Sequence, residues 1–399
     1  MGDQQHQIEG RVEPGFEPVK EAFEKNFEDR DELGAACAVS YQGELVVDIW
    51  GGYKDVERTD PWTEDTLVLV FSTTKGIAAA TIAHARAAGH ISYDARVAEL
   101  WPAFGTNGKE DITVRQLLGH QAGLAAVNQT LTADRLEDRE WLMETLARKR
   151  PDWTPGARHG YHAWTLGWYE SELLRRCDPQ SRALPEYFSA ELADPLDLEF
   201  YIGIPDEIDE GRIAAIQGFG ARDLVGNLTG FPWKMLLALA NPRSMVSKSM
   251  SPFDVSSPAE LNDPPYRYLQ IPAGNGIGAV RDIARLYGAL ATEAGPPGFD
   301  TSTIDALAQP GNPPAEGPQD VILKTETAYS LGFWKPFEGF DFGTPAAFGA
   351  PGAGGSFAFA DPARELGFAY APNRMGVRVW DDPREVALRD AVSLCLDEL

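Results

Sequence analysis

Two stretches with alternating apolar and polar residues lie near opposite ends of the 399-residue chain and constrain its fold most. Residues 36–52 alternate on either side of a Gln42-Gly43 turn, and residues 356–371 do so around Asp361-Pro362. Each stretch is typical of a β-hairpin. Because little strand pattern lies between them, we predict one antiparallel sheet built from both termini, in an α+β fold. Helices over about 19–29 and 383–399 are expected to flank it.

The middle of the chain has a helical pattern. Its apolar residues recur at helical spacing in short segments that Pro and Gly separate: 114–118, 134–148, 164–176, 182–192 and 233–239. We therefore predict an inserted all-α subdomain over residues 96–270, with the sheet domain formed by residues 1–95 and 271–399. A cleft between the two is the expected place for a site.

Composition limits the partners of the protein. Sixty acidic residues against 35 basic ones give a net charge of −25, so a nucleic-acid partner is not expected. The first six residues contain neither a basic nor an apolar region, and the chain has no run of 18 apolar residues. We expect a cytoplasmic protein without a membrane partner. The three cysteines show neither metal nor disulfide spacing. A homo-oligomer is left open.

Ser72 and Lys75 form the sequence's single S-x-x-K motif, between the apolar run 67–71 and an alanine-rich helical segment. A serine at a helix N-terminus faces unpaired N–H groups and the positive end of the helix dipole, which favour a developing alkoxide. A lysine three residues later lies on the same face, and burial would let its amine accept the serine proton. The alternative is a helix-capping serine beside a solvated lysine.

Further segments accompany this motif in a set order. Tyr161 follows a Pro155-Gly156 turn, and the glycine-rich segment 348–356 leads into the strand 357–360. Residues 112–124 contain Leu-Leu-Gly-His-Gln-Ala-Gly-Leu, and residues 275–286 contain a Gly-rich turn and a helix. In this order the chain, from about residue 34 to 373, resembles the serine β-lactamase and penicillin-binding-protein superfamily. It is most similar to the family VIII carboxylesterases, which implies a β-lactamase/transpeptidase-like fold.

The resemblance implies roles for individual residues. Ser72 would be the nucleophile, and Lys75 and Tyr161 would relay its proton. The backbone amides of Ser72 and Ala353 would form the oxyanion hole. A buried core tyrosine is the alternative for Tyr161.

Substrate contacts are expected from Gly352 and Gly354, which permit close approach, and from Trp164 and His162. Packing roles are the alternatives for Trp164 and His162. Residues 329–334 are expected to form the strand before the glycine-rich segment. Ser356 is expected to be structural.

Two departures from the β-lactamase pattern favour esters. Ala163 stands where class C β-lactamases have asparagine, and Ala350-Pro351-Gly352 replaces Lys-Thr-Gly. We therefore expect a serine hydrolase that cleaves short-chain carboxylic esters, a carboxylesterase, with no metal and no cofactor. The alternatives are a β-lactamase or D-amino-acid peptidase or amidase, an acyltransferase, and a non-catalytic binding protein on this fold.

Overall fold

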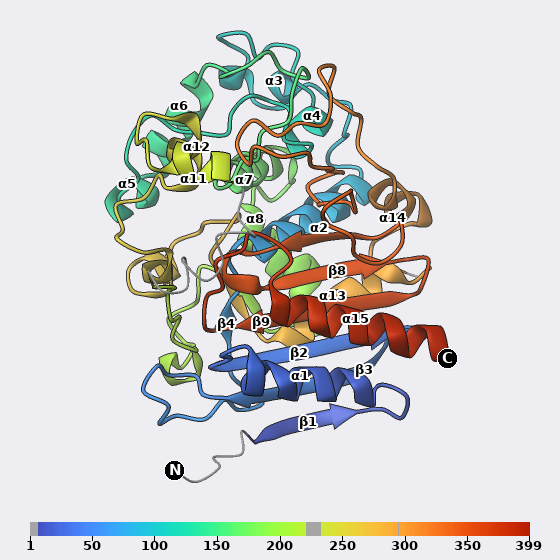
Figure 1. Cartoon of the computed structure of the whole chain (residues 1–399). Helices are drawn as coiled ribbons and strands as arrows, with labels where there is room; N and C mark the ends of the chain where they lie inside the picture. Colours follow the sequence, from blue (N-terminus) through green and yellow to red (C-terminus); the bar gives the residue numbers. More distant parts are fainter. Residues whose placement is uncertain (1–6, 221–232, 294) are drawn as a thin grey trace.

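The computed structural model describes residues 7–220, 233–293 and 295–399, and its main feature is a six-stranded antiparallel sheet (Figure 1). The strands lie in the order β1 (Ile8–Val12), β3 (Glu44–Gly52), β2 (Gly34–Tyr41), β9 (Leu366–Pro372), β8 (Phe357–Asp361) and β7 (Phe348–Pro351). The pairing of β2 with β9, in which Cys37 faces Tyr370, joins the two ends of the chain. The predicted fold class and both hairpins are confirmed.

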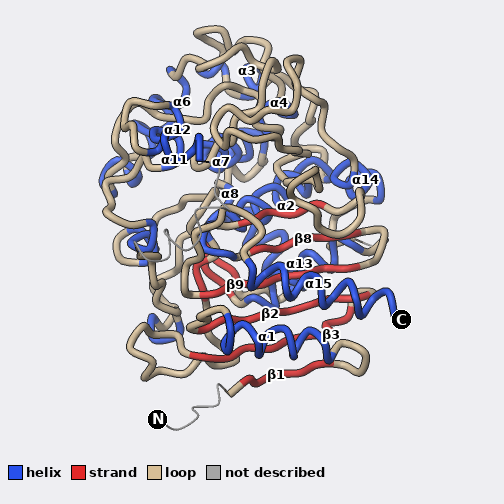
Figure 2. The backbone as a smooth tube through the Cα atoms, in the orientation of Figure 1, coloured by secondary structure: helices blue, strands red, loops and turns tan. Residues whose placement is uncertain are grey.

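The two faces of the sheet differ in side-chain size. On β8, Phe357 and Phe359 belong to the core under α1 (Glu17–Asp29) and α15 (Pro383–Glu398), which cross the same face in Figures 1 and 2. The alternate Ala358 and Ala360 belong to the core that contains α13 (Val280–Ala291). Because successive strand residues point to opposite faces, the Phe-Ala alternation makes one bulky face and one on which α13 can approach closely.

The remaining helices gather on one side of the sheet, in the upper part of Figure 1. They are α2 (Thr74–Ala87), α3 (Val97–Leu100), α4 (Val114–Leu118), α5 (Ala133–Glu137), α6 (Arg139–Arg148), α7 (Thr165–Cys177), α8 (Leu184–Phe188), α9 (Asp194–Leu196), α11 (Trp233–Leu239), α12 (Met245–Met250) and α14 (Thr301–Ala308). Within the described ranges, none of the helices is long and apolar enough to cross a bilayer.

A second, three-stranded sheet links the helical region to the main sheet. It consists of β4 (Val68–Leu69), β6 (Gly276–Gly278) and β5 (Phe200–Ile202). Residues 96–270 were expected to form an all-α subdomain. They are mostly helices and loops, but they also contain the short strand β5. A three-residue strand has no periodic signal of its own. It forms here because the glycines of β6 leave room for the Phe200 ring.

Two other elements differ from expectation. Strand β1 was not predicted, because an edge strand with exposed Glu9 and Arg11 lacks a repeating apolar pattern. Residues 329–334 were expected to be a strand, and this is wrong: Gly332 has φ +90°, and Tyr329 and Trp334 make only isolated bridges. Trp334 makes an isolated bridge with Gly349 of β7, the edge strand of the main sheet.

Candidate active site

A strained turn presents Ser72. Phe71 has φ +46°, a conformation that is costly for a bulky residue, and begins the 3₁₀ turn Phe71–Thr73 that leads into α2. The Thr74 hydroxyl donates to the Phe71 carbonyl (2.5 Å) and accepts from the Gly276 N–H (2.9 Å). These bonds fix the turn against β6. Ser72 stays partly exposed while Thr73 and Thr74 are buried.

Lys75 is 1% exposed and makes three polar contacts. Its Nζ lies 3.0 Å from Ser72 Oγ, 2.6 Å from the Ala163 carbonyl and 2.7 Å from the Ala273 carbonyl. An ammonium group would donate in all three directions. A neutral amine has two N–H groups, which the two carbonyls would accept, and its lone pair would then face the Ser72 hydroxyl. Burial lowers the pKa of Lys75 to about 7, which makes the neutral amine accessible near neutral pH.

Tyr161 completes the cluster. Lys75 Nζ lies 4.9 Å from the centroid of the Tyr161 ring, and the Tyr161 N–H donates to the Asp320 carboxylate (2.9 Å). Burial raises the pKa of the Tyr161 phenol, and its polar contacts with Ser72 and Trp334 partly oppose that rise. The phenol is therefore protonated at neutral pH and is a proton donor close to the nucleophile.

The turn between β7 and β8 lies against the turn that carries Ser72. The Ser356 hydroxyl donates to the Val70 carbonyl (2.8 Å), and the Gly352 N–H donates to the Ser356 carbonyl (2.7 Å). Ser356 therefore has the structural role expected of it. Ala353 is exposed between buried Gly352 and Gly354. Its exposure beside the Ser72 turn suits an amide that contacts substrate.

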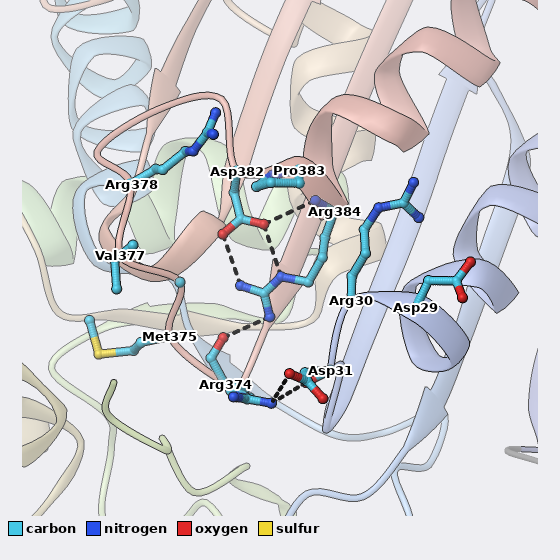
Figure 3. Close-up of a pocket in the computed structure, with 11 residues that line it drawn as sticks. Asp29, Arg30, Asp31, Arg374, Met375, Val377, Arg378, Asp382, Pro383 and Arg384 are labelled. Atoms are coloured by element: carbon cyan, nitrogen blue, oxygen red, sulfur yellow. Dashed lines mark hydrogen bonds and ion pairs between the residues drawn. The ribbon is translucent and has the colours of Figure 1, made fainter. Parts of the chain in front are cut away.

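A buried arginine supports this turn from behind. Arg384 donates to the Gly354 carbonyl (2.9 Å), to both oxygens of Asp382 (2.9 and 3.0 Å) and to Glu32 (3.0 Å). Figure 3 shows Asp382 and Arg384 together at the edge of a cavity of about 360 Å³. A guanidinium whose donors are divided among two carboxylates and the backbone carbonyls of Gly354 and Arg374 fixes the glycine-rich turn in place.

Of the two side chains expected to contact substrate, His162 is buried and Trp164 is partly exposed. His162 is wholly buried: the Leu124 N–H donates to Nε2 (3.0 Å), and Nδ1 lies 2.6 Å from the Gly160 carbonyl. Both ring nitrogens of His162 are engaged within the protein, which favours its packing alternative over a substrate contact. Trp164 is partly exposed, and its indole N–H donates to the Met250 carbonyl (3.1 Å).

Gly352 and Gly354 are required by packing within the protein. A Cβ built on Gly352 would lie 2.2 Å from Ser356 Oγ and 2.4 Å from the Val70 carbonyl. Gly354 has φ +88° and a Cβ there would meet Met375 at 3.1 Å. Neither residue therefore needs a nearby substrate to explain why it is glycine.

Sequence reasoning missed two buried carboxyls near the site. Asp320 accepts from the Tyr161 N–H and from the Tyr329 hydroxyl (2.9 Å each), so it orients the tyrosine segment. Glu170 on α7 is wholly buried and interacts electrostatically with Lys75. Its position one turn from both Leu166 and Leu173, on an apolar helix face, was the available signal.

Comparison with known proteins agrees with this fold. The family profile described as Beta-lactamase matches residues 19–391. Esterase/beta-lactamase LipL of Mycobacterium tuberculosis is 33% identical over 380 residues, which span 94% of this chain and 84% of that protein. A crystal structure of a family VIII carboxylesterase superposes with a TM-score of 0.84 at 34% identity, covering 98% of this chain and 100% of that one. A penicillin-binding protein homolog from Caulobacter crescentus gives 0.81 at 34% identity, with the same coverage.

Proposed function

The chain belongs to the beta-lactamase family and is a serine hydrolase of that fold, and on this basis we propose that it is a carboxylesterase that cleaves short-chain esters. The contacts of Lys75 carry the proposal. Two carbonyls take the hydrogens of the neutral amine, so its lone pair is directed at the Ser72 hydroxyl 3.0 Å away. That is the arrangement in which an amine activates a serine nucleophile.

The proposed reaction has two halves. Ser72 Oγ attacks the ester carbonyl while its proton passes to Lys75 Nζ, and the Ser72 and Ala353 amides stabilise the oxyanion. When the tetrahedral intermediate collapses, the carbon–oxygen bond to the alcohol breaks and Tyr161 protonates the leaving oxygen. Lys75 then returns its proton to Tyr161. Water attacks the acyl-enzyme in the second half and gives a proton to the same pair. The pair returns that proton to Ser72 Oγ as the bond to the acyl carbon breaks and the acid product leaves.

The β7 strand supports esters over charged amide substrates. Ala350, in the position of the lysine in the Lys-Thr-Gly motif, is 1% exposed and supplies no cation for a substrate carboxylate. Ala163 contributes its carbonyl to Lys75 and has no side-chain amide to offer a substrate. Partly exposed Trp164, two residues after the buried His162, is proposed as an apolar contact for the ester.

β-Lactam hydrolysis is the second candidate. The relative LipL carries both activities in its name, esterase and beta-lactamase. Both reactions would use the same acyl-enzyme on Ser72, so relative rates on the two substrate classes distinguish them.

Labelling with a fluorophosphonate tests the assignment of Ser72. We expect the probe to modify wild-type protein at Ser72, identified by mass spectrometry, and p-nitrophenyl butyrate to be hydrolysed. Ser72→Ala should lose both reactions and remain folded, because a small, partly exposed hydroxyl contributes little packing. Ser92→Ala is the matched control, since Ser92 is an exposed serine whose hydroxyl accepts from the Asp94 N–H, and it should still be labelled. A folded Ser72→Ala protein that retains hydrolysis would contradict the proposal, and an unlabelled wild type would favour a non-catalytic binding protein.

A further inference from the structure

Trp334 is a buried indole whose polar atom the proposed reaction does not use. The side chain is 1% exposed, and its Nε1 has no hydrogen-bond partner among the described residues. Leaving a buried donor unsatisfied costs roughly 1–3 kcal/mol. A phenylalanine would avoid that cost, as buried Phe340 does in contact with the Trp334 ring. Packing alone therefore does not explain an indole at this place.

The backbone of Trp334 is fixed to strand β7. Its N–H donates to the Gly349 carbonyl (2.8 Å), and its carbonyl accepts from the Gly349 N–H (3.0 Å). The indole ring meets the Tyr161 ring edge to face, with 5.5 Å between the centroids and 65° between the planes. Because protein interiors are close-packed, two buried rings in this contact fix each other's position. Trp334 is thus held against the proton donor of the proposed reaction.

The Tyr161 phenol supplies the acceptor for this N–H. In the described part of the chain, the aromatic rings in contact with Trp334 are Tyr161, Tyr329, Phe337, Phe340 and Trp380. The phenylalanines have no polar side-chain atom. The Tyr329 hydroxyl is engaged with Asp320 (2.9 Å), and the indole of Trp380 is a donor only. Burial raises the pKa of the Tyr161 phenol, and a polar contact with Trp334 opposes the rise.

This contact falls outside ordinary hydrogen-bond geometry while the phenol keeps its proton. A neutral phenol oxygen is a weak acceptor, whereas hydrogen bonds to a charged oxygen are shorter and stronger. Catalytic hydrogen bonds are often long in the free enzyme and tighten only when the reaction proceeds. An interaction that strengthens as charge develops lowers the barrier of the step in which the charge appears.

We propose that Trp334 is a positioning residue that holds the Tyr161 phenol for proton transfer and donates its N–H to the phenol oxygen as charge develops there. This inference rests on the proposed function. When the bond to the alcohol breaks, its electron pair stays on the leaving oxygen, which takes the phenol proton. The phenol oxygen keeps the O–H electron pair and becomes a phenolate, which Trp334 stabilises until the Lys75 ammonium returns a proton to it. An alcohol that must be protonated to leave therefore depends on Trp334, whereas p-nitrophenolate, which is stable as an anion, does not.

Trp334→Phe tests the proposal, with Trp380→Phe as the matched control. The Trp380 ring lies 5.6 Å from that of Trp334, is partly exposed, and donates its N–H to the Gly339 carbonyl (3.0 Å). We would measure kcat/KM for ethyl butyrate and for p-nitrophenyl butyrate, because kcat/KM reports the steps up to release of the alcohol. In Trp334→Phe the ratio of the ethyl to the p-nitrophenyl value should fall about ten- to a hundredfold, the scale of a hydrogen bond to a charged group. Trp380→Phe should keep the wild-type ratio.

The ratio separates proton transfer from a purely structural role. Loss of packing around Trp334 would slow both esters alike, and an unchanged ratio would overturn the proposal. In a Tyr161→Phe background, Trp334→Phe should not lower the ratio further, because the phenol on which it acts is gone. A further fall would show that Trp334 does not act through Tyr161. If Trp334→Phe does not fold, benzothienylalanine introduced at position 334 replaces the N–H by sulfur in a ring of similar shape and is judged by the same ratio.

Labelling of Ser72 gives a readout that does not depend on ester turnover. The probes are the phenyl and p-nitrophenyl esters of one alkylphosphonate, whose departing oxygens differ in the same way as those of the two butyrates. Trp334→Phe should lower the phenyl-to-p-nitrophenyl ratio of labelling rates, and Trp380→Phe should not. Wild-type protein that is labelled but hydrolyses neither butyrate would contradict the esterase function, while the labelling ratio would still decide the role of Trp334. Wild-type protein that neither probe labels would overturn both proposals.

Discussion

At the scale of single residues, Lys75 joins the separate parts of the site. Its Nζ contacts Ser72 in the turn before its own helix, the Ala163 carbonyl beside Tyr161 and the Ala273 carbonyl ahead of β6. Three chain segments far apart in sequence therefore converge on one nitrogen. In the proposed reaction, the phenol of Tyr161, protonated because burial raises its pKa, would protonate the leaving oxygen while Lys75 holds the proton taken from Ser72.

If Lys75 and Tyr161 act in one proton relay, the effects of their substitutions on kcat should not be additive. Lys75→Met and Tyr161→Phe should each lower kcat for p-nitrophenyl butyrate by about two orders of magnitude or more, the scale of lost general acid–base catalysis. Because the two groups act in one relay, the double variant should be scarcely slower than either single one. A double-mutant cycle at saturating substrate measures this. Losses that simply multiply would show that the two residues act in separate steps.

The candidate site residues that could be predicted from the sequence are those that belong to a local motif. Ser72 and Lys75 are one helical turn apart, so their contact follows from spacing alone, and Tyr161 came from the family's order of motifs. Asp320 and Glu170 are brought near the site by packing across long sequence separations, and neither has a neighbouring motif. For His162, the sequence suggested a substrate contact because the residue adjoins Tyr161. In the structure its ring nitrogens pair with the Leu124 N–H and the Gly160 carbonyl, an arrangement that tertiary packing decides.

At the scale of elements, the close contact between the β7–β8 turn and the Ser72 turn would decide whether the proposed oxyanion hole forms. A Cβ on Gly352 would lie 2.2 Å from Ser356 Oγ and 2.4 Å from the Val70 carbonyl, distances that require the two turns to separate. We predict that Gly352→Ala lowers kcat/KM for p-nitrophenyl butyrate at least about tenfold and destabilises the fold by about 1–3 kcal/mol.

Ala353→Gly is the control for that variant. It removes an exposed methyl group from the same turn and keeps the amide, so kcat/KM should stay close to wild type. Urea unfolding would measure the stability of both proteins. A Gly352→Ala protein with wild-type activity would show that the spacing between the two turns does not matter for catalysis.

Strand β7 also predicts the substrate preference. Ala350 provides no cation and Pro351 no hydroxyl, so an anionic β-lactam loses a charge-assisted hydrogen bond worth roughly 1.5–3 kcal/mol, or about one to two orders of magnitude in kcat/KM. Neutral esters need no such contact. The ratio of kcat/KM for p-nitrophenyl butyrate to that for nitrocefin should therefore be large. Nitrocefin turnover as efficient as ester turnover would place carboxylate recognition elsewhere in the protein.

Helices and strands could be predicted where the apolar pattern of the sequence matched the burial of the side chains in the fold. Phe357 and Phe359 alternate with alanines, and the strand they form has two buried faces of different size. Strands β1 and β5 were missed because both are short, and β1 is an exposed edge. Residues 329–334 looked like a strand because Tyr329, Leu331 and Phe333 alternate with smaller residues, but Gly332 at φ +90° breaks the extended backbone.

At the scale of the whole molecule, the two ends of the chain meet beside the site. Helices α1 and α15 pack together, and the Asn26 side chain donates to the Arg384 carbonyl (3.1 Å). The Arg384 side chain in turn reaches Glu32 and the Gly354 carbonyl, so the first and last helices both support the glycine-rich turn. Chain topology therefore couples global folding to the geometry of the glycine-rich turn that would form the proposed oxyanion hole.

Net charge acts on the molecule as a whole. A charge of −25 on 43.6 kDa is a long-range repulsion that opposes the compact state. Exposed ion pairs such as Arg96–Glu99 oppose it, but each contributes only about 0–1 kcal/mol. We therefore predict that raising NaCl from about 10 to 200 mM, which shortens the Debye length from about 30 Å to below 10 Å, increases the Tm at pH 8.

Repeating the titration near pH 5 is the control for this prediction. That pH is close to the sequence pI of about 4.6, so little net repulsion remains to be screened and the salt dependence of the Tm should shrink or reverse. Differential scanning fluorimetry at the two pH values measures both slopes. A Tm that falls with salt at pH 8 would mean that attractive pairs outweigh the repulsion, with partly buried ones such as Arg212–Glu199 (2.6 Å) the first to examine. The sign of one slope thus decides whether local pairing or net charge dominates the electrostatic free energy of this fold.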